Sequence, residues 1–323
     1  MRRMRIVFMG TPDFAAKSLE RLYNDGHDIA GVFTQADKPR NRGMKLSFSP
    51  VKELALAYNI PVFQPSTLKD GVAAGIIREL NCDLLALVAY GKILTKEIIE
   101  MPPYGSINIH GSILPKYRGA SPIQHAILNG DTETGVTSQY IAKEMDAGDI
   151  ILTKKTAIGE NETSGELFLR LCIMGAELLS ETVEAIEKGT AQRKPQNPNE
   201  VTYAPKLTRE MSPIDWTKNA FEIKNKVRGL SPWPAATMEL DGKTLKVFSV
   251  GISDNKEDIP PGSIISAGKA GLEIACADGT VLVREVQAPG GKRMSAADYL
   301  RGIRNCSEGI QNIYSSSSQC TAL

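Results

Sequence analysis

The sequence is poor in the residues that most often mark a metal site or a disulfide-bonded fold. It has 323 residues but only three histidines. Its five cysteines are scattered along the chain, at Cys82, Cys172, Cys276, Cys306 and Cys320. Without closely spaced Cys or His pairs, neither a zinc site nor a disulfide framework is expected. We therefore expect no bound metal and isolated, reduced thiols.

Long apolar runs are also absent. No stretch approaches the roughly 20 apolar residues that a membrane-spanning helix needs. The N-terminal MRRMRIVFMG passes from basic residues directly into a strand-like pattern, without a cleavable signal segment. A cytoplasmic protein without a membrane partner is the expectation.

A strong charge of either sign is missing as well, because the formal net charge is only +1. A strongly basic nucleic-acid-binding protein is therefore excluded. Any contact with an anionic polymer must come from local basic patches.

Short, continuously apolar strand patterns alternate with helical patterns through the first half of the chain. The strand patterns are RIVFM, HDIAGVFT, IPVF and DLLALVAY, and the helical ones include SPVKELALAYN and the stretch from Thr67 to Leu80. Strands this apolar are buried on both faces, as in parallel sheets covered by helices. The pattern predicts an α/β domain with a doubly wound, mainly parallel sheet over residues 1–189, closed by a long helix that begins near Thr163.

The first strand runs into GTPDFAAKSLERL, where Thr11 could cap a helix and Pro12 suits its first position. A dinucleotide-binding turn is the alternative for this segment. GTPDFA lacks the three-glycine spacing that lets a backbone approach a pyrophosphate, so that alternative is disfavoured.

The composition changes after residue 189. Residues 190–208 contain three prolines and little apolar periodicity, which predicts a linker. Residues 209–312 then hold one helical pattern, NAFEIKNKVRGL, and five short strand patterns joined by Gly-containing turns. These features predict a small antiparallel barrel or sandwich, followed by a loosely ordered Ser-rich tail over residues 313–323.

The segment SINIHGSILP contains the most suggestive polar pair. Asn108 and His110 are two positions apart, so on a strand they point to the same side. Both can donate hydrogen bonds to an oxygen that gains charge in acyl transfer, and ligands of open α/β sheets bind beyond the carboxyl ends of strands. The alternative is that both side chains only satisfy nearby backbone groups.

Downstream, Asp146 lies in the Gly-containing segment EMDAGDI. It could orient the imidazole of His110 and favour its charged form. The alternative is a turn aspartate that bonds its own backbone, which is the commoner fate of Asp beside Gly. Spacing alone does not decide between these two roles.

A resemblance decides the matter. The stretch NIHGSILPKYRGASPIQHAILNGDTETGVTSQYIAKEMDAGDI is similar to the signature region of the formyltetrahydrofolate-dependent formyltransferases, with Ile113 where Leu is usual. GTPDFAA, FTQADKPRNRGMKLSFSPVK, QPSTL, VAYGKIL and PWPAA resemble the members that act on initiator methionyl-tRNA. The resemblance spans nearly the whole chain. It implies a Rossmann-like catalytic domain and a C-terminal β-barrel with an oligonucleotide-binding-like (OB-like) topology.

The resemblance also implies roles for individual residues. Asn108, His110 and Asp146 correspond to the catalytic trio. The 10-formyltetrahydrofolate co-substrate is expected to lie against two stretches: Ser112, Ile113, Leu114 and Pro115, and the backbone of Leu87, Val88, Ala89 and Tyr90.

The basic loop QADKPRNRGMK follows the second strand pattern. A charge run in such a loop is usually solvated surface. In the family the equivalent loop grips the acceptor end of the tRNA, so we expect tRNA contacts from Lys38, Arg40, Arg42 and Lys45, extended along the linker by Arg193, Lys194 and Lys206. Such contacts would position the aminoacyl end without reading much sequence.

The resemblance therefore implies formyl transfer to the α-amino group of methionine on initiator tRNA, by a chain in which nothing demands more than a monomer. The same trio would serve a formyltetrahydrofolate hydrolase, or a formyltransferase for a sugar amine or a purine precursor. A catalytically idle RNA-binding module is suggested by the barrel alone, but the intact trio argues against it.

Overall fold

The computed structural model describes residues 4–40, 45–253, 255 and 259–304. The chain forms two compact units. The first holds the chain up to Ile123, residues 133–157 and residues 167–205. The second holds residues 124–132, residues 158–166 and the chain from Lys206 onward. Each unit is described below by itself.

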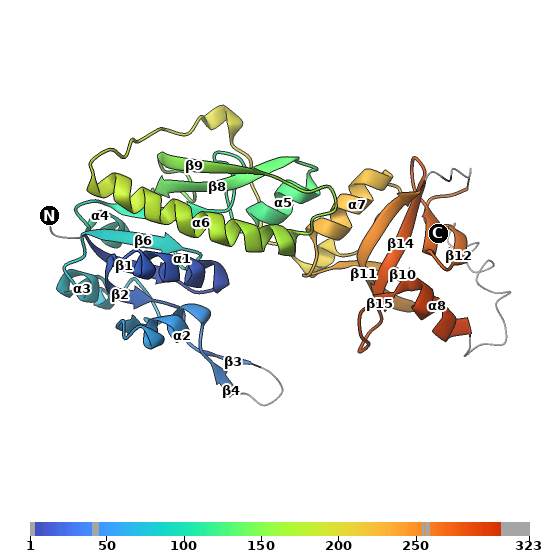
Figure 1. Cartoon of the computed structure of the whole chain (residues 1–323), viewed down its shortest axis with the longest axis horizontal. Coiled ribbons are helices and arrows are strands. Elements are labelled where there is room, and N and C mark those ends of the chain that lie inside the picture. Colours follow the sequence, from blue (N-terminus) through green and yellow to red (C-terminus); the bar gives the residue numbers. More distant parts are fainter. Residues whose placement is uncertain (1–3, 41–44, 254, 256–258, 305–323) are drawn as a thin grey trace. The chain divides into compact units, whose positions relative to one another are not determined.

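A seven-stranded sheet forms the centre of the first unit, in the order β5-β2-β1-β6-β7-β8-β9 (Figure 1). The strands from β5 to β7 are parallel, whereas β8 runs antiparallel to both β7 and β9. Their bounds are Arg5–Gly10 for β1, Asp28–Phe33 for β2, Val62–Phe63 for β5, Leu84–Val88 for β6, Ser106–His110 for β7, Glu133–Tyr140 for β8 and Ile150–Ala157 for β9.

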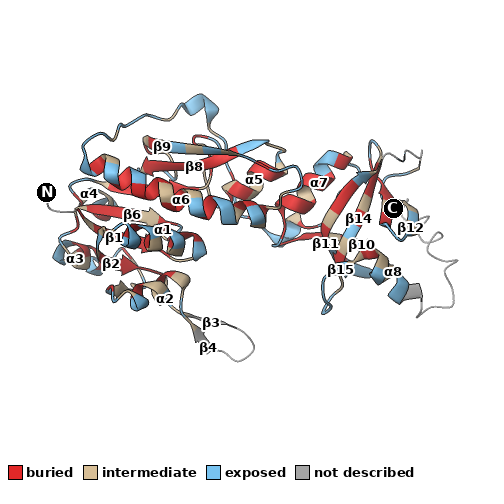
Figure 2. Cartoon of the chain, viewed as in Figure 1, coloured by how far each residue is buried: buried red, intermediate tan, exposed pale blue. Residues whose placement is uncertain are grey.

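Helices cover both faces of this sheet, and its central strands β1, β6 and β7 are almost entirely buried (Figure 2). On one face, Val7 and Met9 of β1 and Leu85 of β6 pack with buried residues of α3 (Val72–Glu79) and α4 (Lys96–Glu100). The alternation of side chains along β1 directs Ile6 and Phe8 to the opposite face. The predicted doubly wound, mainly parallel sheet is confirmed.

Helix α1 (Asp13–Asn24) and helix α6 (Ser164–Glu187) pack together in the first unit, where the Phe14 and Phe168 ring centroids are 5.8 Å apart. Helix α2 (Pro50–Ala57) lies beside α1. Its start follows from the sequence, because Ser49 caps the helix by accepting the Lys52 N–H and Pro50 takes the first position.

The cap expected from Thr11 is wrong. Helix α1 begins after Pro12 without a side-chain cap, and the Thr11 hydroxyl instead donates to the carbonyl of Tyr90, at 3.2 Å. The helix predicted from Thr67 begins only at Val72, because residues 67–71 form turns. At Thr11 a contact distant in sequence replaces the expected cap, and before Val72 local turns delay the start of the helix.

The basic segment after β2 is partly a hairpin rather than a loop. Strand β3 (Lys38–Arg40) pairs antiparallel with β4 (Lys45–Ser47), and Figure 1 shows the two strands apart from the main sheet. Arg42 lies outside the described residues. At the base of the hairpin the Lys52 ammonium pairs with the Asp37 carboxylate at 2.5 Å, and the hydrogen bonds from Lys52 and Gln64 hold the pKa of Asp37 below its usual range.

The segment expected to be a linker packs against the first unit as far as Pro205. Lys194 exchanges two backbone hydrogen bonds with Ile150, and Ala204 donates to the carbonyl of Arg118. Between them lies a single 3-10 turn, Pro198–Glu200. Residues 190–205 therefore form an ordered strap on the catalytic unit, and a second 3-10 turn, Arg209–Met211, follows it.

The second unit is built on a six-stranded antiparallel sheet, in the order β10-β11-β14-β13-β12 with β15 paired to β14. The bounds are Ala236–Leu240 for β10, Lys243–Ser253 for β11, Ile264–Gly268 for β12, Gly271–Ala275 for β13, Thr280–Gln287 for β14 and Met294–Ser295 for β15. This confirms the predicted antiparallel β domain. Register shifts around Ser249 in β11 bend the sheet locally.

Two helices pack on the core of this second sheet, and a third belongs to the same unit. Helix α7 (Ala220–Gly229) starts with a capping box between Asn219 and Glu222 and buries Ile223 and Val227 against the sheet. Helix α8 (Ala296–Arg304) packs against the core through Ala296. The third helix is α5 (Pro122–Leu128), most of which lies in this unit. None of the helices in the described part of the chain is long and apolar enough to cross a membrane.

Candidate active site

Asn108 and His110 lie on β7, at the point where the parallel part of the sheet meets its antiparallel part. In the register with β8, Asn108 is opposite Gln139 and His110 is opposite Thr137. Directly opposite residues of an antiparallel pair point to the same side, so these four polar side chains share one face of the sheet. Asn108 and His110 are 9% and 6% exposed, which makes both of them buried polar groups.

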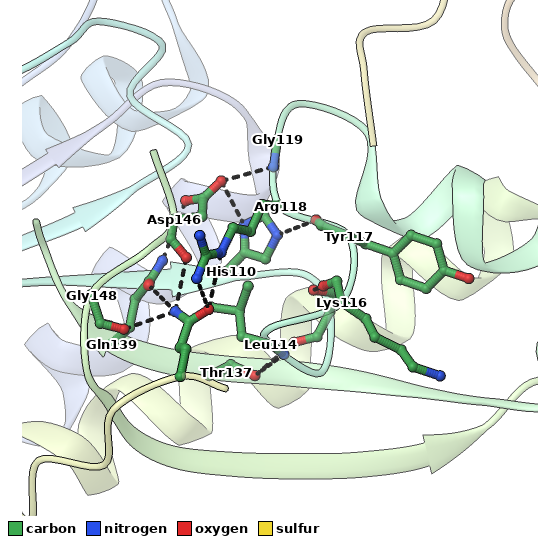
Figure 3. A network of polar contacts seen from close by, with 12 residues as sticks. His110, Leu114, Lys116, Tyr117, Arg118, Gly119, Thr137, Gln139, Asp146 and Gly148 are labelled. Carbon is green, nitrogen blue, oxygen red and sulfur yellow. Dashed lines mark hydrogen bonds and ion pairs between the residues drawn. The ribbon is translucent and has the colours of Figure 1, made fainter. Parts of the chain in front are cut away.

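The imidazole of His110 is held between two oxygen acceptors. Its Nε2 lies 2.8 Å from the carbonyl oxygen of Tyr117, which can only accept, so Nε2 carries a proton and donates it. Its Nδ1 faces Oδ2 of Asp146 at 3.6 Å (Figure 3). That separation is too long for a direct hydrogen bond. The Asp146 side of the ring therefore still has hydrogen-bonding capacity for a third group.

Asp146 is fixed by contacts from separate parts of the chain. Oδ2 accepts the backbone N–H of Gly119 at 2.9 Å, and Oδ1 accepts the Gln139 amide at 3.3 Å. The backbone carbonyl of Asp146 accepts the Gln196 amide at 2.8 Å. These bonds hold Asp146 at φ +52°, in the left-handed region that non-glycine residues seldom adopt. Such a conformation persists only where its surroundings enforce it.

The turn after β7 is tied down by its own hydroxyl groups. The Ser112 hydroxyl donates to the carbonyl of Lys116 at 2.6 Å. The Thr137 hydroxyl donates to the carbonyl of Ser112 at 2.7 Å and accepts the Leu114 N–H at 3.2 Å (Figure 3). Side-chain and backbone groups thus give the turn a single shape, which directs the Tyr117 carbonyl at His110.

Two glycines allow the segments around Asp146 to approach one another. A Cβ on Gly119, which has φ +122°, would lie 2.7 Å from the carbonyl oxygen of Ala204. A Cβ on Gly148 would lie 1.7 Å from the carbonyl oxygen of Tyr140. Only glycine fits at either position, so the close backbone packing that places the Asp146 carboxylate depends on both.

The two stretches expected to hold folate lie beside this face. Ser112, Ile113, Leu114 and Pro115 form the turn that follows β7. Leu87 and Val88 end β6, where Leu87 is the parallel neighbour of Asn108, and Ala89 follows at φ +46°. The carbonyl of Tyr90 accepts the amide of Gln35 at 2.9 Å. The two stretches therefore leave adjacent strands at the same edge of the sheet.

The phenol of Tyr90 is fully buried in the core cluster under α3 and α4, and its hydroxyl has no hydrogen-bond partner among the described residues. Burial raises the pKa of Tyr90 to about 12. The side chain of Tyr90 is therefore a neutral core group, and the contribution of this residue to the site comes from its backbone.

The basic residues expected to contact tRNA lie in three parts of the chain. Lys38, Arg40 and Lys45 lie in the β3–β4 hairpin. Arg193 lies on residues 190–205, where its guanidinium stacks 3.7 Å from the centroid of the Tyr140 ring, and Lys194 is exposed beside it. Lys206 is exposed, and it begins the part of the chain that belongs to the second unit.

Sequence patterns alone did not point to the residues that hold the trio in place. These residues are Gln139, Tyr117, Gly119, Arg118 and Gln196. Gln139 could have been found from the alternation along β8, had the register with β7 been known. Gln196 carries no sequence signal of its own, because it lies in a proline-rich segment that resembles a connector.

Over the residues that the structure describes, no group of three or more His, Cys, Asp and Glu side chains is placed to hold a metal ion.

Two family descriptions match this chain. Residues 4–183 match the formyl transferase family and residues 206–304 match the formyl transferase C-terminal domain. The chain is 46% identical over 299 residues to the methionyl-tRNA formyltransferase of Alkaliphilus oremlandii, covering 93% of this chain and 96% of that protein. It is also 46% identical over 300 residues to the enzyme of the same name from Acetivibrio thermocellus, covering 93% and 96%.

Solved structures share the fold at low identity. The sugar 3N-formyl transferase WlaRD superposes with a TM-score of 0.65 at 21% identity, over 89% of this chain and 98% of that one. HypX from Aquifex aeolicus, solved with tetrahydrofolic acid, superposes with a TM-score of 0.61 at 19% identity, over 93% of this chain and 47% of that one.

Proposed function

Because this chain belongs to the methionyl-tRNA formyltransferase family, we propose that it transfers the formyl group of 10-formyltetrahydrofolate to the α-amino group of methionine on initiator tRNA. The product is N-formylmethionyl-tRNA, which serves the start of translation. One observation carries the proposal within the structure. His110 is held between the Tyr117 carbonyl and Asp146, on the face of β7 that also bears Asn108.

The chemical step is a direct acyl transfer. The free amine of methionine attacks the formyl carbon, a C–N bond forms, and the bond between that carbon and N10 of the folate breaks. The amine loses one proton overall and N10 gains one, so no further reactant is needed. The protein has to stabilise the tetrahedral intermediate and move that proton.

Asn108 and His110 are the proposed donors to the oxyanion. The Asn108 carboxamide lies on the face of β7 that also bears His110, and its N–H groups are proposed to donate to the substrate oxygen. Nε2 of His110 already donates to Tyr117, which leaves Nδ1 as the ring atom for a second role. A proton on Nδ1 could be shared between Asp146 and the oxyanion, because the 3.6 Å separation leaves that hydrogen bond unmade.

Asp146 is the proposed proton acceptor. A carboxylate that is fixed by the Gly119 N–H and the Gln139 amide cannot swing away from the amine. Such positioning makes proton transfer effective when the acceptor lies within hydrogen-bond reach of the amine, directly or through one water. Hydrogen-bond donors and a fixed base carry every step, and no step is assigned to a metal.

The folate is proposed to bind between the two stretches that leave the strand ends, Leu87–Tyr90 and Ser112–Pro115. Backbone groups in both stretches are fixed by side chains. Thr137 bonds the backbone of Ser112 and Leu114 in one stretch, and Gln35 bonds the carbonyl of Tyr90 in the other. A rigid backbone rim suits a planar heterocycle that must be held in one orientation.

The tRNA is proposed to contact Lys38, Arg40 and Lys45 of the hairpin. We propose further contacts from Arg42 and, later in the chain, from Arg193, Lys194 and Lys206. We place catalysis in residues 1–189, the linker in residues 190–208, and a second tRNA-binding domain in residues 209–312, followed by a tail over residues 313–323. The two family matches, which end at residue 183 and begin again at residue 206, support this division. We propose that the enzyme acts as a monomer.

A formyltransferase for a sugar amine is the second candidate, because solved sugar formyltransferases share the fold. The test supplies labelled formyltetrahydrofolate with charged initiator tRNA, uncharged initiator tRNA, charged elongator tRNA, a nucleotide-linked amino sugar, or buffer alone. The proposal expects label on charged initiator tRNA. Label on the sugar, or formate released equally without an acceptor, would overturn it in favour of a sugar formyltransferase or a hydrolase.

A further inference from the structure

We infer that Gln196 is a positioning residue for Asp146, and that Arg118 fixes the direction in which the Gln196 amide points. The inference rests on the proposed function, because it assigns Gln196 an effect only through the proposed proton acceptor. Gln196 comes from the proline-rich residues 190–205, which otherwise read as a connector.

The amide nitrogen of Gln196 faces three oxygen acceptors around the Asp146 loop. Nε2 lies 2.8 Å from the carbonyl oxygen of Asp146, 2.8 Å from that of Gly148 and 3.2 Å from Oε1 of Gln139. Two N–H groups thus serve three acceptors at the loop that presents the carboxylate. The left-handed backbone of Asp146 is among the groups that they hold.

The oxygen of the same amide faces a cation. Nε and Nη2 of Arg118 donate to Oε1 of Gln196 at 3.1 and 2.7 Å. A guanidinium has donors only and carbonyl oxygens are acceptors only, so the reverse orientation of the amide would lose all of these bonds. Arg118 therefore fixes which end of Gln196 meets the Asp146 loop.

The same short turn also supports the other catalytic groups. Arg118 stands between Tyr117, whose carbonyl accepts from His110, and Gly119, whose N–H donates to Asp146. Gln139 contacts Asp146 (Figure 3) and Gln196, and it is the strand partner of Asn108. Gln196 thus completes a hydrogen-bond network that fixes the position of Asp146 relative to Asn108 and His110.

The arrangement predicts a specific kinetic effect. Without the Gln196 amide, the Asp146 carboxylate can still accept a proton but is held less firmly in position. Misplacement of a catalytic group by about 1 Å can lower a rate by about a hundredfold. We expect Gln196→Ala to lower kcat by roughly tenfold to a hundredfold while KM for formyltetrahydrofolate changes little. Gln196→Glu should behave similarly, because it keeps an acceptor for Arg118 but sets a carboxylate against the carbonyls of Asp146 and Gly148.

The experiment measures single-turnover formylation of charged initiator tRNA by the full-length wild type and by the single variants Gln196→Ala, Gln196→Glu and Asp146→Asn. It also measures the two double variants that combine a Gln196 change with Asp146→Asn. Asn197→Ala is the matched control, because the side chain of this exposed neighbour bonds Asn199 and Glu200 of its own turn, and no other partner is found among the described residues. Gln196 variants should be slow in the wild-type background and cause little further loss beside Asp146→Asn. Thermal unfolding of each variant identifies those that remain folded, and Gln196→Glu preserves side-chain size if the alanine variant does not fold.

Normal rates for both folded Gln196 variants, with Asp146→Asn slow, would overturn the inference and leave the proposed function intact. An equal further loss in the Asp146→Asn background would also overturn it, because Gln196 would then act independently of Asp146. A wild type that does not formylate charged tRNA would contradict the proposed function itself.

Discussion

Nδ1 of His110 and Oδ2 of Asp146 face each other at 3.6 Å, although they come from a strand end and from a separate hairpin loop. On the far side of the ring, Nε2 donates to the Tyr117 carbonyl at 2.8 Å. The imidazole is thus fixed on one side and open to hydrogen bonding on the other. A reacting group that enters near Asp146 meets a donor whose direction is already set, and this is the arrangement that acyl transfer requires.

Replacing Asp146 with Asn should separate charge from shape. The amide can still accept the Gly119 N–H but cannot take up a proton from the attacking amine. We expect turnover to fall by about a hundredfold, which is within the range that a positioned acid or base contributes. KM for formyltetrahydrofolate should change little in steady-state assays. A variant with normal turnover would remove Asp146 from proton transfer.

Two glycine substitutions should have opposite effects on stability. Gly119→Ala adds a Cβ at φ +122° against the Ala204 carbonyl oxygen, and we expect a loss of about 1–3 kcal/mol together with a loss of activity. Gly75→Ala lies within helix α3, where a Cβ meets nothing within 4 Å, and should gain about 0.5–1 kcal/mol. Urea unfolding measures both. Equal stability of the two variants would contradict the packing described for the Gly119 turn.

The cations of the β3–β4 hairpin should govern tRNA binding rather than folate binding. Lys38→Ala, Arg40→Ala and Lys45→Ala are each expected to raise KM for charged tRNA and to reduce the slope of log affinity against log salt by about 1. KM for formyltetrahydrofolate should not change. Lys154→Ala is the control, because Lys154 is already paired with Glu177 and Glu181. An unchanged salt slope in all three hairpin variants would exclude phosphate contacts there.

Two buried thiols make the fold sensitive to alkali. Burial raises the pKa of Cys172 to about 12 and that of Cys82 to about 11, from an ordinary value of 9.0. Between pH 9 and those values the unfolded chain loses thiol protons that the folded chain keeps. Their stabilising contribution is therefore complete below pH 9 and is lost as the pH rises toward 11–12.

Unfolding in urea at pH 8 and at pH 10 measures this loss, and Cys172→Ala should reduce it. The comparison is made between the slopes of stability against pH, because the substitution also changes packing at both pH values. An identical slope in the variant would show that Cys172 does not contribute.

Much of the fold follows from local patterns. The predicted strand pattern RIVFM lies within β1, and the predicted pattern DLLALVAY contains β6. The hairpin of β3 and β4 was not predicted, because its three-residue strands are too short for alternation to show. Helix α8 was also not predicted, since it is short and packs only Ala296, Tyr299 and Leu300 against the core of the described second unit.

The site likewise contains residues that local patterns predict and residues that they do not. Asn108 and His110 share a face because strand alternation requires it, and the sequence indicates this directly. Strand register brings Gln139 to the site, and a left-handed turn brings Asp146 to it. The path of residues 190–205 brings Gln196 to the backbone of Asp146. These are tertiary features that no local pattern encodes. Resemblance to a family identified Asp146, whereas only the structure identifies Gln196.

The most direct test of the account is the single-turnover rate of formyl transfer to charged initiator tRNA by His110→Ala. The imidazole is the donor that both Tyr117 and Asp146 orient, so we expect a loss of about a hundredfold to a thousandfold. His27→Ala is the matched control and should be near wild type, because its Nε2 makes no hydrogen bond within the described residues. A His110→Ala enzyme that is folded and formylates at close to the wild-type rate would contradict the account.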